Sequence, residues 1–453
     1  MSNSKRQVWF AVFVVVGLLS LASCGGSSSG GSQQQQVTVS ITGTPPSTIG
    51  IGANWQYTAT VSGSANTAVN WTASAGTIDS NTGVFIAPNT VPNPPTVTIT
   101  AASQSNPSST KSTTVTVQAN DPIGSVSSSS QLGSCVGSVS GGTCYQLAIS
   151  CPGVADFSAY LKVNTPPVFP VGTVLLGVGT GGSGLYDDPN AGGYIDGSNV
   201  ITSLLTSGYN TVQVSFGAPF DNGTTPRGWL TGPGGVRRLA CRYATVADWV
   251  YNNPTIINSN VSASNSAPMC ATGNSGGSAV IAYAVYEYGL ASEFRMIEPT
   301  SGPVMTRIDQ GCGPCGSSTF QNACTASSQD MCYTTGGSSG GDAATIDEAY
   351  QASGAATPTP CADAINGTPA QAGLFLSDSI LYQGAQAVSL PNMTTKQLFG
   401  DTDTSNAVPQ GTFWNQFISP TPALQCLSGV AHDIPSFSTG AQQIATDIAS
   451  ACK

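Results

Sequence analysis

The sequence predicts an α/β domain, with a mostly parallel sheet flanked by helices, preceded by a small all-β sandwich. Two observations carry this prediction. Over residues 142–453, strand-like apolar runs alternate with runs of helical periodicity, a pattern typical of parallel sheets covered on both faces. Residues 37–120 instead hold short period-two runs separated by Gly, Pro and Asn, which is typical of an antiparallel sandwich. A chain of 453 residues has room for both.

The first 23 residues have the anatomy of a signal peptide. A short basic patch precedes an apolar run that ends in Leu21-Ala22-Ser23-Cys24. This ending resembles the lipobox of bacterial lipoproteins, which implies cleavage before Cys24 and lipidation of its thiol. Residues 24–36 are polar, of low complexity, and predict a flexible tether. We therefore expect a protein of the bacterial cell envelope, held to the membrane by its N-terminal lipid anchor and facing the periplasm or the exterior.

Residues 37–120 predict a sandwich because apolar and polar residues alternate in several short runs, such as Thr96–Thr100 and Thr113–Val117. The stretch from Trp71 to Asp79, followed by Gly83-Val84-Phe85, resembles bacterial Ig-like domains of group 2. The resemblance implies a spacer or an adhesive module. Residues 121–141, with a run of serines, are expected to form a linker.

Charge and cysteine content narrow the possible functions. Only 8% of residues are charged and the net charge is −10, so the chain lacks the basic patch that binding to nucleic acid requires. Beyond Cys24 there are twelve cysteines, an even number that predicts up to six disulfides in an exported chain, with the pairing left open. Cys312 and Cys315 have C-x-x-C spacing, but a histidine partner and a thioredoxin-like context are both missing. We expect neither a metal nor another cofactor.

In the α/β region, apolar runs mark the expected strands and helices. Its strands are expected at residues 174–178, 211–216, 267–272, 294–297, 395–399 and 424–427. Its helices are expected at residues 278–288, 371–383, 413–418 and 440–452, and one more where apolar residues recur at helical spacing, at Leu239, Tyr243, Val246 and Val250. Between residues 309 and 362 the periodicity disappears and five cysteines gather, which predicts a disulfide-stapled insertion acting as a cap.

A candidate nucleophile follows the strand expected at residues 267–272. Gly273-Asn274-Ser275-Gly276-Gly277 fits the G-x-S-x-G turn, in which glycines leave room for a serine lifted clear of the sheet. The same pattern occurs at residues 26–30, 336–340 and 337–341. Only Ser275 follows an apolar strand and opens an apolar helix, so it is the predicted nucleophile.

The only histidine of the chain, His432, is the one candidate imidazole base for that serine. A carboxylate between the two would orient the ring. Asp403 is the first choice because the turn from Gly400, with Val408-Pro409 behind it, resembles the acid turn of many α/β-hydrolases. Asp401 and Glu298 remain alternatives.

An oxyanion hole is expected from the amide of Gly276 and from the glycine-rich loop after residues 174–178, through Thr180 and Gly181. The histidine that often opens this loop in esterases is absent here. Glycine-rich loops are common in this chain, so a plain turn remains an alternative.

Together, Ser275, Asp403, His432 and the Gly179–Gly182 loop resemble the α/β-hydrolase superfamily over residues 142–453. The resemblance implies attack by Ser275 on an acyl carbonyl and an acyl-enzyme, and it leaves the substrate open. The leading hypothesis is a surface-tethered carboxylic ester hydrolase, with esters of extracellular polymers as one candidate class of substrate. Two alternatives stay open: a peptidase or amidase on the same fold, and a non-catalytic surface adhesin or binding lipoprotein.

Overall fold

The computed structural model describes residues 36–43, 45, 48–51, 54–88, 90–261, 268–336, 341–350, 359–368, 372–381, 388–390 and 392–453. The predicted signal peptide, Cys24 and nearly all of the predicted tether lie outside these residues. No helix in the described part of the chain is long and apolar enough to cross a membrane.

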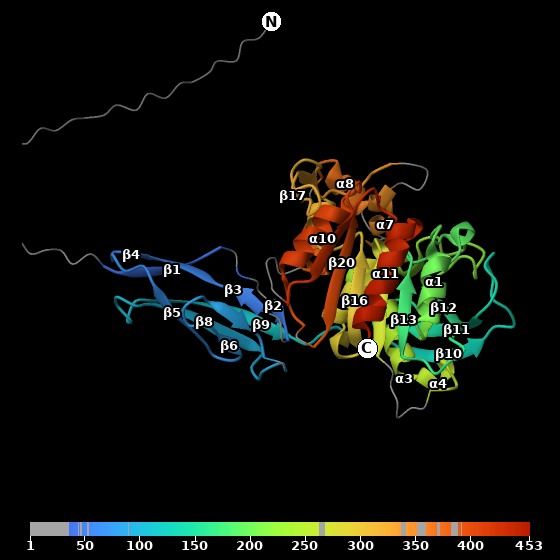
Figure 1. Cartoon of the computed structure of the whole chain (residues 1–453). Helices are drawn as coiled ribbons and strands as arrows, with labels where there is room; N and C mark the ends of the chain where they lie inside the picture. Colours follow the sequence, from blue (N-terminus) through green and yellow to red (C-terminus); the bar gives the residue numbers. More distant parts are fainter. Residues whose placement is uncertain are drawn as a thin grey trace, which may run out of the picture.

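Residues 36–118, the sandwich region, form an all-β unit (Figure 1). Four strands make its largest sheet, in the order β2-β9-β8-β5, and the others form sheets of three strands (β3-β7-β6) and two strands (β1-β4). Alternate residues of β8 are buried, so one face of that sheet packs on a core that contains Tyr57, Trp71 and Phe85. The strands are β1 (Thr38–Thr42), β2 (Thr48–Gly50), β3 (Asn54–Gln56), β4 (Thr58–Ser62), β5 (Val69–Ala73), β6 (Thr77–Ile78), β7 (Val84–Ile86), β8 (Thr96–Ser103) and β9 (Thr110–Gln118).

Residues 125–453, the α/β region, are built on one nine-stranded sheet. The strands from β14 to β22 are parallel, and the three at the other end pair antiparallel. The prediction of a mostly parallel sheet is thus confirmed. In spatial order the strands are β10 (Ser125–Gln131), β11 (Thr143–Ser150), β12 (Phe157–Asn164), β14 (Tyr209–Ser215), β13 (Gly172–Gly177), β15 (Met269–Asn274), β16 (Phe294–Thr300), β20 (Thr394–Gly400) and β22 (Ala423–Leu427).

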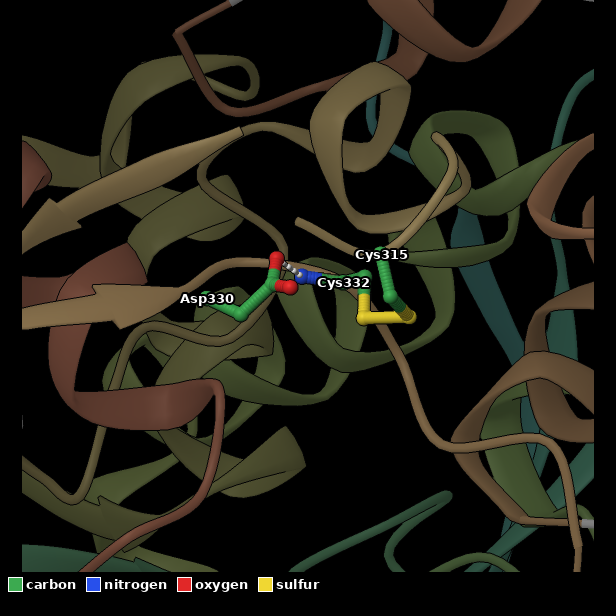
Figure 2. Close-up of side chains that lie close together, drawn as sticks. All are labelled: Cys315, Asp330 and Cys332. Atoms are coloured by element: carbon green, nitrogen blue, oxygen red, sulfur yellow. Dashed lines mark hydrogen bonds between the residues drawn. A yellow bond between two sulfur atoms is a disulfide. The ribbon is translucent and has the colours of Figure 1, made fainter. Parts of the chain in front are cut away.

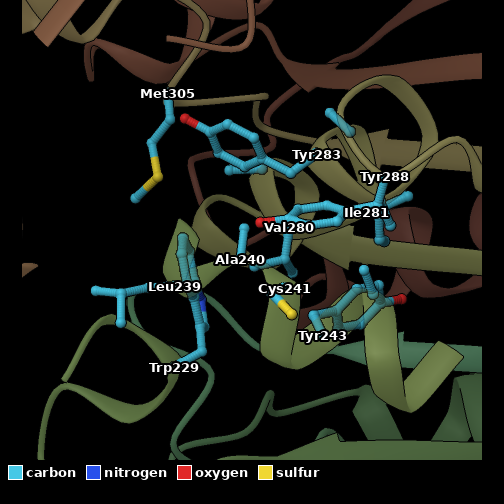
Figure 3. Packing of buried hydrophobic residues seen from close by; sticks show 14 of the residues in the cluster. Trp229, Leu239, Ala240, Cys241, Tyr243, Val280, Ile281, Tyr283, Tyr288 and Met305 are labelled. Atoms are coloured by element: carbon cyan, nitrogen blue, oxygen red, sulfur yellow. The ribbon is translucent and has the colours of Figure 1, made fainter. Parts of the chain in front are cut away.

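Helices cover both faces of this sheet, as predicted. Along β13, Val174 and Leu176 belong to the core under one pair of helices, whereas Leu175 belongs to the core on the other face. The first pair is α1 (Gly197–Thr206) and α11 (Ser438–Ala451); the second face carries α3 (Cys241–Asn252) and α5 (Gly276–Tyr286). Figure 3 shows the second core, where Tyr243 and Ile281 pack among other buried side chains.

The stretch expected to be a linker, residues 121–141, contains β10, which pairs antiparallel with β11. The expected linker is therefore wrong at Ser125–Gln131. Nearly all side chains of this edge strand are exposed, so backbone hydrogen bonds hold it without a buried face that the sequence could reveal. The single helix face expected from Leu239 to Val250 is also divided, because α2 (Val236–Leu239) ends just before α3 begins.

The predicted insertion carries short elements over the carboxyl end of the sheet (Figure 1). They are α6 (Ile308–Gly311), β17 (Thr319–Gln321), β18 (Ser328–Asp330), α7 (Gly341–Tyr350) and α8 (Pro360–Ile365), followed by α9 (Ala372–Asp378). The remaining helices and strands are α4 (Pro254–Ile257), α10 (Ala407–Gln416), β19 (Val388–Ser389) and β21 (Ile418–Ser419).

All twelve cysteines beyond Cys24 pair, which confirms six disulfides. Two of them hold the insertion: Cys312–Cys361 joins residues near its two ends, and Cys324–Cys426 joins it to β22. The two C-x-x-C cysteines therefore have different partners, since Cys315 binds Cys332 beside the Asp330 carboxylate (Figure 2). The other bridges are Cys135–Cys144, Cys151–Cys241 and Cys270–Cys452.

Candidate active site

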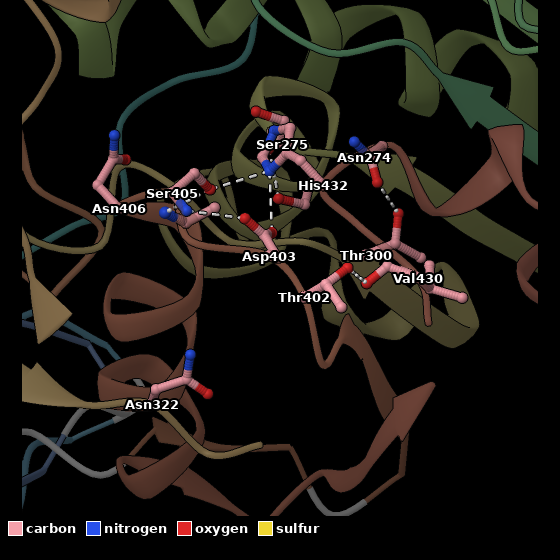
Figure 4. Close-up of polar contacts among 12 residues, drawn as sticks. Asn274, Ser275, Thr300, Asn322, Thr402, Asp403, Ser405, Asn406, Val430 and His432 are labelled. Carbon is pink, nitrogen blue, oxygen red and sulfur yellow. Dashed lines mark hydrogen bonds and ion pairs between the residues drawn. The ribbon is translucent and has the colours of Figure 1, made fainter. Parts of the chain in front are cut away.

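Ser275 occupies the sharp turn between β15 and α5. Its φ of 55° and ψ of −117° lie in a region of backbone conformation that residues other than glycine rarely adopt. A nucleophile elbow has this strained conformation. The turn is held by the next strand, because the Ser275 amide donates to the Thr300 carbonyl at 2.9 Å. The Thr300 hydroxyl donates to Asn274 Oδ1 at 2.8 Å (Figure 4).

The glycines of the turn are required by close backbone contacts. A Cβ at Gly273 would lie 2.6 Å from the Gly277 carbonyl carbon, and one at Gly276 would lie 1.9 Å from the Thr180 oxygen. No side chain fits at either distance. The second contact also shows that the glycine-rich loop after β13 lies directly against the start of α5.

Of the three positions expected at an oxyanion hole, two reach the candidate site. Thr180 and Gly276 line the same cavity as Ser275. Thr180 has a φ of 51°, and the loop is anchored by the Gly179 amide, which donates to the Tyr194 hydroxyl at 2.9 Å. Gly181 is not among the lining residues. Its carbonyl instead accepts a hydrogen bond from the Trp229 amide at 2.8 Å, which helps to hold the glycine-rich loop in place.

His432 lies in the loop after β22 and lines the same cavity as Ser275. Figure 4 shows the two residues close together. Its Nδ1 is 3.0 Å from Asp403 Oδ2. The two loops are joined at their bases, since the Thr402 hydroxyl donates to the Val430 carbonyl at 2.7 Å. Within the described residues no hydrogen bond links the Ser275 hydroxyl to the ring; such bonds are often long before substrate binds.

The two alternative carboxylates are engaged elsewhere. Asp401 accepts a hydrogen bond from the Gly429 amide at 2.7 Å, which shapes the loop that carries His432. Glu298 is fully buried in β16, close to Asp447 and Lys396 beneath α11. Asp403 is therefore the one of the three carboxylates that contacts the imidazole.

The pair has the electrostatics of a charge-stabilised imidazole. Burial disfavours the charged form of both groups, but the hydrogen bond and the charge of the partner outweigh it. The pKa of Asp403 is consequently lowered and that of His432 is raised above 6.5. Asp403 can thus stay ionised and stabilise imidazolium.

Residues that the sequence did not single out complete the site. Ser405 Oγ is also 3.0 Å from His432 Nδ1, and the Ser405 amide donates to Asp403 Oδ1 at 2.9 Å. Spacing could have signalled this turn, because a residue two positions after an aspartate commonly donates to its carboxylate. Asp342 lines the cavity from α7, and its Oδ2 accepts from Asn406 Nδ2 at 3.0 Å. Nothing in the sequence signals that second contact.

No protein-family profile matches the sequence, and neither does any curated protein. Among solved structures, the chain is similar to the esterase domain of a Rhodothermus marinus protein (10% identity, TM-score 0.37, covering 68% of this chain and 96% of that one). It is also similar to a thermostable carboxyl esterase from Bacillus coagulans (13%, 0.39, 68% and 97%) and to an esterase from Pyrobaculum calidifontis (15%, 0.38, 68% and 85%).

Proposed function

We propose that the protein is a serine hydrolase that cleaves carboxylic esters, with Ser275 as nucleophile, His432 as base and Asp403 as the orienting acid. The observation that carries the proposal is the shared cavity: a serine on a strained strand-to-helix turn lines the same cavity as an imidazole whose Nδ1 contacts a buried carboxylate. The chain order of serine, aspartate and histidine supports it as well.

In this proposal Ser275 Oγ attacks the acyl carbonyl carbon while its proton passes to His432 Nε2. The amides of Gly276 and Thr180 stabilise the negative charge that develops on the carbonyl oxygen. The intermediate collapses, the bond to the alcohol oxygen breaks, and His432 returns the proton to that oxygen. Water, deprotonated by the same ring, then releases the carboxylic acid from Ser275.

A fluorophosphonate probe, which reacts only with an activated serine, tests this proposal. Wild type should be labelled, and labelling should fall by several orders of magnitude in Ser275→Ala and in His432→Ala. The serines of the competing G-x-S-x-G patterns provide matched controls, so Ser338→Ala and Ser339→Ala should be labelled like wild type. A folded wild-type protein that is not labelled would refute the proposal.

We also propose that the protein is exported and lipid-anchored through Cys24, with the sandwich region as an Ig-like spacer. Six disulfides among the described residues support an oxidising compartment. The lipobox-like ending of the apolar N-terminal run supports the anchor. In cells fed a labelled fatty acid, wild type should carry the label and fractionate with membranes, whereas Cys24→Ser should do neither. An unlabelled wild type would refute the anchor.

A further inference from the structure

The cavity beside Ser275 is small. Its volume is about 180 Å³. Drug-sized ligands occupy pockets of roughly 300–1,000 Å³, and a cavity of about 150 Å³ just accommodates benzene. By comparison with benzene, the cavity holds an acyl group of about six carbon atoms, counting the carbonyl carbon.

One wall of this cavity comes from the insertion. Asp342, Thr345 and Ile346 of α7 all line it, and their spacing places them on one face of the helix. Val304 and Met305, from the loop after β16, make the apolar floor together with the Tyr333 ring. The Tyr333 hydroxyl donates to the Val304 carbonyl at 2.9 Å, which fixes the ring in this wall.

The cavity wall is held by contacts inside the insertion and by a contact from outside it. Asp347, on the buried side of α7, accepts a hydrogen bond from the Cys361 amide, and Cys361 is bonded to Cys312. From outside the insertion, Arg227 Nη1 donates a hydrogen bond to Thr345 Oγ1 at 3.0 Å. Helix α7 is thus held in place, so its side chains set a fixed limit to the cavity.

The charge around the cavity is predominantly negative. Three carboxylates act on the His432 ring through their charge, those of Asp403, Asp433 and Asp342. Asp342 is held in position because its Oδ2 accepts from Thr334 Oγ1 and from Asn406 Nδ2, each at 3.0 Å. Among the described residues that line the cavity there is no lysine or arginine, and Arg227 contacts the wall at Thr345 Oγ1.

We propose that α7 restricts the site to esters of short, uncharged acyl groups, with Ile346 limiting acyl length and Asp342 excluding acyl groups that carry a carboxylate. This proposal rests on the proposed esterase function. A long acyl chain would have to displace Ile346 and the floor beneath it, at a cost that close-packed walls make large. A second carboxylate in the cavity would lie near Asp342, which is exposed, so the two negative charges would repel each other through partial screening by water and salt.

The test compares four nitrophenyl esters: acetate, butanoate, octanoate and the monoester of succinate, which matches butanoate in length but ends in a carboxylate. For wild type, kcat/KM should be at least about tenfold higher for butanoate than for octanoate. It should also be about tenfold higher for butanoate than for the succinate ester.

Two variants assign these limits to their residues. Ile346→Ala should raise the ratio of octanoate to butanoate hydrolysis about tenfold, and Asp342→Asn should raise the ratio of succinate ester to butanoate about fivefold. Glu348→Gln is the matched control, because it removes the same charge from α7 at a position that does not line the cavity, so it should change neither ratio.

The outcomes separate the two proposals. Octanoate or the succinate ester hydrolysed as fast as butanoate by a probe-labelled wild type would overturn the acyl limit alone. Variants that leave both ratios unchanged would overturn the roles of Ile346 and Asp342. Absence of ester hydrolysis together with absence of probe labelling would overturn the esterase function and this inference with it.

Discussion

The sandwich region and the α/β region belong to one chain but are stabilised by different means. Residues 36–120 contain no cysteine and only two charged residues, Asp79 and Lys111. The α/β region carries all six disulfides and a set of buried ionisable groups. The stability of the sandwich region depends on an aromatic core and on backbone pairing between strands. The α/β region adds disulfide bonds to its core. Sensitivity to redox state should therefore be confined to the α/β region, and sensitivity to pH should be larger there than in the sandwich region.

The largest expected effect comes from the bridge that closes the longest loop. Cys270–Cys452 spans 182 residues and Cys135–Cys144 spans 9. Loop entropy predicts that replacing the first pair by serine lowers the free energy of unfolding by roughly 5 kcal/mol, against roughly 2.5 kcal/mol for the second. Calorimetry of the full chain should show the α/β transition moving and the sandwich transition unchanged. Equal shifts for both pairs would contradict the entropic explanation.

The converse experiment removes a core residue from the sandwich region. Trp71 is 3% exposed and its ring centroid lies 6.0 Å from that of Tyr57. Trp71→Ala should lower the stability of this region by about 3–5 kcal/mol through lost burial and a residual cavity. Since the candidate site lies wholly in the α/β region, kcat/KM for a short ester should stay unchanged. A parallel loss of activity would show that the two regions are coupled.

A smaller effect is expected on the pH dependence of stability, which should have opposite signs in the two regions. Burial, with Asp447 beside it, raises the pKa of Glu298 well above 4.5. In the unfolded chain Glu298 loses its proton at a lower pH than in the folded chain. The free energy of unfolding of the α/β region should therefore fall as pH rises above 4.5. In the sandwich region the exposed Asp79 has a lowered pKa, because backbone amides of Thr82 and Asn81 donate to it. Its small contribution should be present above the usual pKa and lost only in acid.

Calorimetry from about pH 2 to about pH 8, which spans the ordinary pKa of both carboxyl groups, checks this difference. Glu298→Gln should flatten the pH dependence of the α/β transition, and Asp79→Asn should leave that transition as it is. An unchanged slope in Glu298→Gln would show that another group releases the proton.

The smallest effect is expected at the site itself. The base must be neutral, and the pKa of His432 is raised, because Asp403 and the other carboxylates outweigh the opposing effect of burial. The acidic limb of kcat/KM should therefore have its midpoint above pH 6.5. Asp342→Asn, which removes one of those charges, should move the midpoint to lower pH. Glu348→Gln should leave it in place, and a shift of the same size there would indicate a diffuse charge effect.

The sequence was most informative where apolar runs are long and buried. β15 and α5 were predicted within a few residues because both are almost fully buried, and Ser275 could be singled out at their junction. β10 was missed because backbone pairing holds a strand of exposed serines, and composition does not report such pairing. Asp342 could not be foreseen beside His432, since disulfides and loop packing bring α7 there without any periodic pattern.

The bridge between Cys324 and Cys426 has a consequence for protein engineering. Cys426 lies in the strand that leads into the His432 loop, so the insertion and the histidine share one covalent frame. The insertion therefore cannot be exchanged as a module. If it were transplanted without Cys426, or replaced by a cap from another protein, one cysteine of this pair would be left as an unpaired thiol. Libraries that alter substrate range are better built by point substitution on the inward face of α7 than by recombination of caps.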